Sequence, residues 1–285
     1  MNEILNYYFF KDVIDNLEKK YHNIIKDETK NAFLFSNIIE MPLYYNFFKN
    51  KNNKDYNLYK HFHNDKFFEV INIMANKVLE NDYNPKLLLL LYGYISSYIF
   101  SKYLNQYLDI YKLFKERHLK SLEKMTYETK ENKKYSRLNI AKEFLFEQDP
   151  LIIDVMQEVV AKLYYNSYGE KILEKGINNY QKYMYRYNVD PLRIKRLYLG
   201  FLGLFSKRNK IDKRILVHSY KSLLDSTNKS QKEWYLFNEL VNYNYQEMYQ
   251  LALNEASVII NIISEQIFYK KKTNISKLDK FSHLG

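Results

Sequence analysis

Three small polar residues stand four positions apart in the most apolar stretch of the chain. Ser97, Ser101 and Asn105 share one face of a helix, because residues four apart stack one above the other. Such a face suits three metal ligands or three catalytic carboxylates, yet these side chains are neutral. Two interpretations stay open. The face is either an inward-facing site that lacks its chemistry, or a strip of small residues that lets another helix approach closely.

A second candidate lies in the histidine-containing segment 61–65. Its order, His61-Phe-His63-Asn-Asp65, is similar to a metal-binding signature of hydrolases with a β-sheet core, but that signature works on a loop after a strand. The context here is helical. His61, Asp65 and Glu69 also share a helical face and match zinc by ligand type. We favour a polar, exposed helix start. No persuasive Ser/His/Asp triad and no Gly-rich phosphate loop is present.

Helices must position these residues. The chain has only six glycines and four prolines, too few for the tight turns of a sandwich or barrel. Apolar residues recur at three- and four-residue spacing, so we predict an all-α protein. We expect helices over 6–21, 31–39, 65–79, from 85 through 93–108, 118–128, 137–146, 150–168, 170–187, 191–206, 213–225 and 246–269.

Composition narrows the class of protein. The net charge is +11, but the basic residues are spread over several segments, so we favour solvated faces over a nucleic-acid surface. The 30 tyrosines fit an AT-rich bacterial genome. The absence of cysteine excludes disulfides and thiolate metal sites. The first residues lack the basic region of a signal peptide, and the longest uncharged run, of 15 residues, is shorter than a bilayer span. We therefore expect a soluble cytoplasmic protein.

Several segments resemble the bacterial zinc-dependent phospholipase C-like family. The segments 6–13, 39–47 and 60–63 stand where that family has a His-Tyr-x-Phe start, a Gly-Pro-Asp-Pro-Phe-Phe-Tyr loop and a His-His-Glu helix start. The stretch 93–108 is similar to the family's helix Gly-Phe-Ile-Cys-His-Tyr-Ala-Leu-Asp-x-x-x-His-Pro-Tyr, and 119–123 corresponds to a later His-x-x-x-Glu helix. The likeness covers most of the chain and is strongest in its first 125 residues.

The resemblance implies one helical domain over residues 1–270 and a basic C-terminal tail over 271–285, which we expect to fray. It also marks the positions at which the family carries zinc ligands. These vestigial metal-site positions are Asn6, Met41, His61, Ser97, Ser101, Asn105, Leu119 and Glu123. Only His61 and Glu123 keep residue types that bind zinc, and two scattered ligands do not make a site. We expect Ser97, Ser101 and Asn105 to face inward, near Asn6, Met41 and His61.

The resemblance therefore implies a catalytically degenerate phospholipase C-like protein, a pseudoenzyme that acts as a binding or interaction module. We expect no catalytic residues and no cofactor; zinc would belong here only if the pseudoenzyme interpretation were wrong. An anionic membrane surface or an acidic protein partner would suit the basic surface and the tyrosines. Two alternatives stay open: an altered metal-dependent phosphodiester hydrolase, and a basic helical protein that associates with nucleic acid.

Overall fold

Helices dominate the part of the chain that the structure describes, which confirms the predicted all-α class. The computed structural model describes residues 3–31, 35–37, 66–111, 114–133, 149–164 and 227–269, with positions 174, 176, 178, 179, 281, 283 and 284. The predicted helices 137–146, 191–206 and 213–225, and most of 31–39 and 170–187, lie outside these residues.

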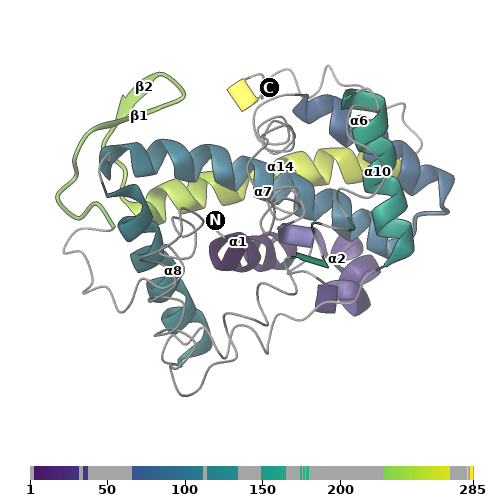
Figure 1. Cartoon of the computed structure of the whole chain (residues 1–285), viewed down its shortest axis with the longest axis horizontal. Coiled ribbons are helices and arrows are strands. Elements are labelled where there is room, and N and C mark those ends of the chain that lie inside the picture. The colour runs from purple at the N-terminus through teal and green to yellow at the C-terminus, as the bar shows by residue number, and fades with distance from the viewer. Residues whose placement is uncertain are drawn as a thin grey trace, which may run out of the picture.

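Helix α7 (Pro85–Leu108) is the centre of the structure (Figure 1). Its start is where the sequence predicts it. Pro85 occupies the first turn, where its missing N–H costs no hydrogen bond, and the Asn84 side chain accepts from the backbone N–H of Lys86 at 2.9 Å. Helix α6 (Phe67–Glu80) precedes it in an antiparallel pair, in which Phe67 stacks on Tyr98 with ring centroids 4.1 Å apart.

Helix α14 (Tyr245–Phe268) runs antiparallel to α7 along most of its length. Tyr245 lies against Tyr107 at one end of the pair, and the hydroxyls of Tyr92 and Ser264 are 2.6 Å apart nearer the other end. A capping box of Asn244 and Glu247 starts the helix, because each side chain satisfies a backbone N–H of the other's residue.

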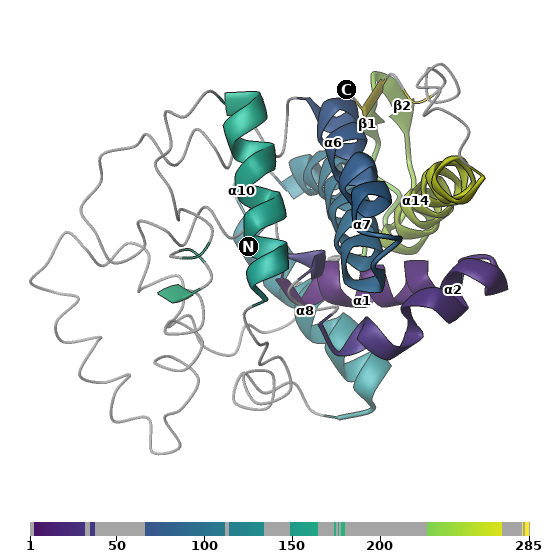
Figure 2. The same cartoon turned by 90° about the vertical axis from the view of Figure 1, so that its right-hand side faces the viewer.

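The predicted helix 6–21 is wrong as one element. The structure has α1 (Glu3–Asp15), then α2 (Lys19–Ile25) and the 3-10 helix η1 (Lys26–Asn31). The break has a local cause: the Asn16 side chain donates to the carbonyl of Asp12 at 2.7 Å, a bond that competes with continuation of the helix. Figure 2 shows α1 and α2 beneath the α6, α7 and α14 layer.

The remaining helices flank this core. The 3-10 helix η3 (Asp109–Tyr111) continues α7, and α8 (Lys115–Glu131) follows and contacts α1 near its own C-terminal end. Helix α10 (Pro150–Tyr164) lies beside α6 (Figure 2). Three lysines hold α10 in this position. Lys66 Nζ donates to the Leu163 carbonyl at 2.9 Å. Lys77 pairs with Glu158 and Lys86 pairs with Asp149, each at 2.7 Å.

A small β-hairpin was not predicted. Strands β1 (Trp234–Leu236) and β2 (Glu239–Val241) pair antiparallel, with Tyr235 opposite Leu240. Its two-residue turn, Phe237-Asn238, has positive φ at both positions. Asn-Gly or Asp-Gly is the usual sequence signal for such a turn, and neither is present here. Trp234 and Leu236 are buried and anchor the hairpin on the body, where Trp234 lies against Tyr107.

Residues near the end of the chain also pack on the body. We call Phe281, His283 and Leu284 the 281–284 segment. Phe281 and Leu284 are buried, and the Tyr98 hydroxyl donates to the Leu284 carbonyl at 2.8 Å. The expectation that the whole tail frays is therefore wrong for these three residues. Their apolar side chains have a place on the core.

Two of the described helical stretches, Pro85–Tyr111 and Tyr245–Phe268, are long and apolar enough to cross a membrane by length and composition alone. In the first, 94% of the apolar window is buried inside the protein, and in the second 50%. A buried core helix passes the same test, so the finding is weak evidence for a membrane span.

Candidate functional site

A chain of neutral polar side chains connects α1 to α7 through residues 36 and 37. Asn6 of α1 donates through Nδ2 to Asn37 Oδ1 at 3.3 Å, and Asn37 Nδ2 donates to Ser36 Oγ at 3.2 Å. Ser97 of α7 donates to the backbone carbonyl of Ser36. All four residues are buried. The structure thus brings two vestigial metal-site positions, Asn6 and Ser97, to the same short segment: Asn6 bonds to the side chain of Asn37, and Ser97 bonds to the backbone of Ser36.

The same segment explains the small residues on α7. A Cβ placed on Gly93 would lie 2.6 Å from both the backbone carbon and the backbone oxygen of Phe35. Gly93 and Ser97 are one turn apart, so together they form a shallow strip against which residues 35–37 lie. This supports the interpretation that the strip serves close packing, although the partner is a short segment of chain rather than a long helix.

Ser101 and Asn105 differ in their surroundings. Ser101 is buried, and its hydroxyl oxygen has no hydrogen-bond partner among the described residues. Asn105 is exposed, so the expectation that it faces inward is wrong. Each four-residue step rotates a helical position by about 40°, so Asn105 lies about 80° round the helix from Ser97. The three positions do not form one inward face.

Two of the vestigial metal-site positions, Leu119 and Glu123, lie on α8, and both side chains are buried. Leu119 belongs to the apolar core. Glu123 is 1% exposed and pairs with Lys120 at 2.6 Å between Nζ and Oε2, while its Oε1 has no hydrogen-bond partner among the described residues. The Glu123 charge also contributes to raising the pKa of the Tyr245 phenol, after the larger effect of burial. Glu123 therefore lies near α14.

The remaining candidates lie mostly outside the described residues. Met41 and His61 are among them, as are His63 and Asp65 of the alternative zinc motif. Glu69, the third member of that motif, is exposed on α6. Over the described parts of the chain, no three His, Cys, Asp or Glu side chains lie close enough together to hold a metal ion.

Comparison with known proteins adds no assignment. No protein-family model matches this chain, and neither a curated protein nor a solved structure matches it. The candidate site must therefore be judged from its own geometry.

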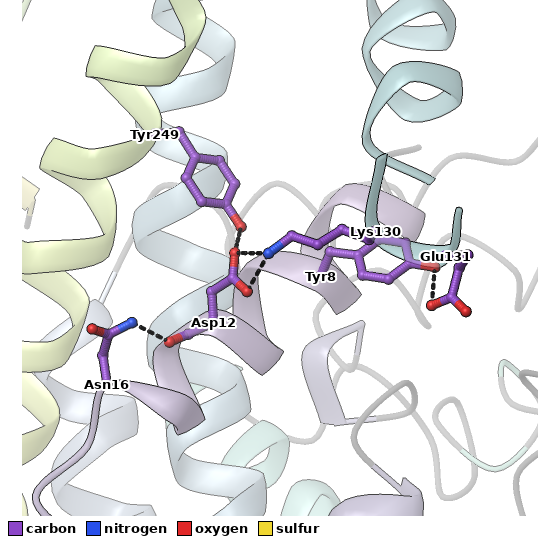
Figure 3. A network of polar contacts seen from close by, with 6 residues as sticks. All are labelled: Tyr8, Asp12, Asn16, Lys130, Glu131 and Tyr249. Carbon is purple, nitrogen blue, oxygen red and sulfur yellow. Dashed lines mark hydrogen bonds and ion pairs between the residues drawn. The ribbon is translucent and has the colours of Figure 1, made fainter. Parts of the chain in front are cut away.

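A second polar network, which sequence reasoning missed, joins α1, α8 and α14 (Figure 3). Lys130 Nζ lies 2.6 and 2.7 Å from the two carboxylate oxygens of Asp12, and the Tyr249 hydroxyl donates to Asp12 Oδ2 at 2.7 Å. On the neighbouring turn of α1, the Tyr8 hydroxyl donates to Glu131 Oε1 at 2.9 Å. Asp12 thus accepts from side chains of two other helices.

The electrostatics of this network keep both phenols neutral. Burial raises the pKa of Tyr249 far above its ordinary value, and the hydrogen bond to the Asp12 carboxylate raises it further. The same two causes, with Glu131 as the acceptor, raise the pKa of Tyr8. A phenol held neutral is a permanent donor rather than a base or a nucleophile. Each phenol therefore serves as a hydrogen-bond donor that links α1 to another helix.

One feature of the sequence could have predicted part of this network. Tyr8 and Asp12 stand four apart on the face of α1 that also carries Phe9 and Val13, and a carboxylate beside an apolar stripe needs a donor from another element. The identity of that donor, Tyr249, could not be read from spacing, because 237 positions separate it from Asp12.

Proposed function

We propose that this chain is a catalytically inactive, phospholipase C-like helical protein that acts as a binding or interaction module. One observation carries the proposal. At Asn6 and Ser97, where the resemblance would put metal ligands, neutral side chains are bonded to residues 36 and 37 inside the core. Metal-assisted phosphodiester hydrolysis needs several anionic or imidazole ligands around the ion and a water molecule activated by it.

The side chains of Asn6 and Ser97 support the view that metal-assisted hydrolysis has been lost, rather than altered. An amide and a hydroxyl compete poorly with water for zinc, and neither supplies the negative charge that stabilises the ion in a protein interior. Glu123, which keeps a ligand type, has one oxygen paired with Lys120. Its charge is thus offset by a lysine of its own helix.

Zinc analysis tests the proposal. The protein is purified without chelators and dialysed, and its metal content is measured by elemental analysis. We expect no stoichiometric zinc. One or more zinc ions per chain that survive dialysis would refute the proposal and revive the altered hydrolase. A phosphodiesterase assay with added zinc gives a second readout, for which we expect no activity above that of buffer with zinc.

We propose a cytoplasmic location for this module. The burial of most of the apolar window of α7 supports a core role for that helix. Cell fractionation tests this point. Recovery of the protein only after detergent extraction of membranes would contradict it.

A further inference from the structure

Large apolar side chains are exposed at the end of the molecule where α7 ends. Tyr235 and Leu240 stand opposite each other on the β-hairpin and are 67% and 55% exposed, and Phe114, the residue before α8, is 50% exposed. The hairpin packs on Tyr107 in the last turn of α7, and α8 follows η3, which continues that helix. Figure 1 shows the hairpin and the start of α8 at the left of the molecule. We call Phe114, Tyr235 and Leu240 the exposed apolar end.

Two cations without a carboxylate partner follow Phe114 on α8. Arg117 and Lys124 are both exposed and lie two turns apart on one face of the helix, about 10 Å along its axis. Over the described residues neither side chain forms an ion pair, and the Arg117 guanidinium lies over the Phe114 ring, 5.4 Å from its centroid. We call Arg117 and Lys124 the α8 cations. They differ from three other lysines of α8 and its ends, each of which pairs with a carboxylate: Lys115, Lys120 and Lys130.

Helix stability does not explain a cation at the start of α8. The N-terminus is the positive end of the helix dipole, where anions stabilise a helix and cations destabilise it. Phe114 is the N-cap residue and makes no side-chain capping hydrogen bond. Arg117 stands in the first turn, so its charge adds to that of the helix end. The start of α8 therefore presents positive charge beside an exposed aromatic ring, and a negatively charged partner relieves the repulsion.

The hairpin does not oppose this charge. Its two exposed carboxylates, Glu233 and Glu239, are matched in number by two exposed lysines that precede the first strand, Lys229 and Lys232. The segment 229–240 is thus neutral as a whole. Its exposed apolar pair can approach an anionic surface without a net repulsion, and the α8 cations supply the attraction.

This combination fits the boundary layer of an anionic lipid bilayer. Aromatic and aliphatic side chains enter the region between headgroups and acyl chains, while arginine and lysine are attracted to anionic lipids. A single-stranded nucleic acid binds cations and aromatic rings, on which its bases stack. It gains little from an exposed leucine, so Leu240 favours the bilayer.

We propose that the exposed apolar end and the α8 cations form a contact surface for an anionic lipid membrane. This inference rests on the proposed function, because it names the partner of a non-catalytic binding module. With three apolar side chains and two cations, the contact is peripheral and reversible, and salt weakens it. It agrees with the proposed cytoplasmic location, since the cytoplasmic leaflet carries anionic lipids.

Co-sedimentation of the full-length protein with vesicles tests the proposal. One set of vesicles is phosphatidylcholine alone, and the other contains about one-third phosphatidylserine. We expect binding to the mixed vesicles to be at least about tenfold tighter than binding to phosphatidylcholine alone, and to weaken steeply as salt is raised.

Single charge changes test the α8 cations. Arg117→Gln and Lys124→Gln should each weaken binding to the mixed vesicles about fivefold, the usual contribution of a cation at an anionic bilayer. Lys19→Gln is the matched control, because it removes one exposed charge from α2. Tyr21 of α2 stacks on Phe268 at the end of α14, which runs antiparallel to α7, so α2 lies at the other end of α7. The control should change binding less than about twofold, since charges far from the bilayer are screened.

Removal of apolar groups tests the rest of the surface. Tyr235→Ser with Leu240→Ser, and separately Phe114→Ser, should each weaken binding about tenfold. Serine is a better N-cap residue than phenylalanine, so Phe114→Ser should not destabilise α8, and its loss of binding has no explanation in unfolding. Tyr269→Ser, at a position 58% exposed after the end of α14, is the control and should bind as the unaltered protein does. Thermal melts report whether each variant is folded.

Three results would overturn the inference. The first is equal binding to the two sets of vesicles, or binding to neither. The second is binding that Arg117→Gln, Lys124→Gln and the apolar variants leave unchanged. The third is tighter binding to a single-stranded oligonucleotide than to the mixed vesicles, which would assign the α8 cations to nucleic acid. None of these results changes the zinc content. Stoichiometric zinc would refute the proposed function without changing vesicle binding, so the two failures are distinguishable.

Discussion

The hydroxyl of Tyr249 donates a 2.7 Å hydrogen bond to the carboxylate of Asp12, and so joins the first and the last long helix of the described chain. Lys130 binds the same carboxylate from α8 (Figure 3). Asp12 is thus the point at which three helices meet. A bond between a neutral donor and a charged acceptor is stronger than one between neutral groups, so this contact should matter for stability.

Tyr249→Phe removes the donor and keeps the ring, which lies against Phe9 and Phe100. We expect the free energy of unfolding to fall by about 1–2 kcal/mol, because Asp12 keeps only Lys130. Urea unfolding measures the change. Tyr235→Phe is the matched control, since Tyr235 is 67% exposed, and it should cost less than about 0.5 kcal/mol. Equal effects of the two substitutions would show that the hydrogen bond contributes nothing.

Gly93→Ala sets helix propensity against packing. Alanine is favoured over glycine inside a helix by about 1 kcal/mol. The added methyl would lie 2.6 Å from the backbone of Phe35, which cannot rotate away as a flexible side chain would. We expect packing to win and the protein to lose about 1–3 kcal/mol. Asn105→Ala, at an exposed position of the same helix, should be neutral or slightly stabilising. A stabilised Gly93→Ala protein would mean that residues 35–37 do not lie against α7.

Restoring metal-ligand types should not restore a metal site. We consider a variant with Asn6→His, Ser97→His and Ser101→Asp. Residues 36 and 37 occupy the space beside Asn6 and Ser97, so larger side chains there have no room, and a buried aspartate costs several kcal/mol when unpaired. We expect a lower melting temperature that added zinc does not raise. A rise in midpoint with zinc but not with magnesium would show that a zinc geometry persists.

We expect acid to weaken the attachment of α10, because Asp149 loses its charge at low pH. Partial burial disfavours its charge, but hydrogen bonds from Lys86 and from the backbone N–H of Leu151 outweigh burial and lower the pKa of Asp149. A carboxyl whose pKa is lower in the folded state stabilises the protein above its unfolded pKa, about 3.9, and loses that contribution as pH falls through the folded value. Asp149→Asn should cost about 1 kcal/mol at pH 7 and flatten stability below about pH 4.

The measurement for this prediction is urea unfolding as a function of pH, for the unaltered protein and for Asp149→Asn. The control is Asp154→Asn, an exposed position on the same helix. If Asp149→Asn and the unaltered protein lose stability in parallel on acidification, Asp149 is not the group responsible.

Alkaline titration should separate two classes of tyrosine. Burial raises the pKa of Tyr92 and Tyr245, and burial followed by a carboxylate neighbour raises that of Tyr8, Tyr103 and Tyr249. Such phenols stabilise the protein below their unfolded pKa, about 10, and this stability is lost as pH rises toward the folded values. Absorbance of tyrosinate should therefore rise in two steps, the second coinciding with loss of helical circular dichroism. A single step in the folded protein would contradict these shifts.

Local sequence patterns correctly predicted where two of the helices begin. Pro85 after Asn84 marked the start of α7, and Pro150 after Asp149 marked that of α10, because proline and a preceding acceptor satisfy a helix start without distant partners. The break within 6–21 and the hairpin were not predicted, for two different reasons. Asn16 bonds to the backbone of its own helix, and the Phe237-Asn238 turn has an uncommon sequence whose positive φ angles persist with the support of packing.

The sequence by itself determined that the chain is helical, that its most apolar stretch carries small neutral residues, and that those residues are poor metal ligands. Only the tertiary structure decided which of these residues are buried and which residues they contact. It brought Asn6 and Ser97 to residues 36 and 37, turned Asn105 to solvent, and placed Phe281, His283 and Leu284 on the body. The physical reason is that helical periodicity acts over a few residues, whereas a hydrogen bond such as that from Tyr98 to Leu284, 186 positions apart, depends on how whole helices pack.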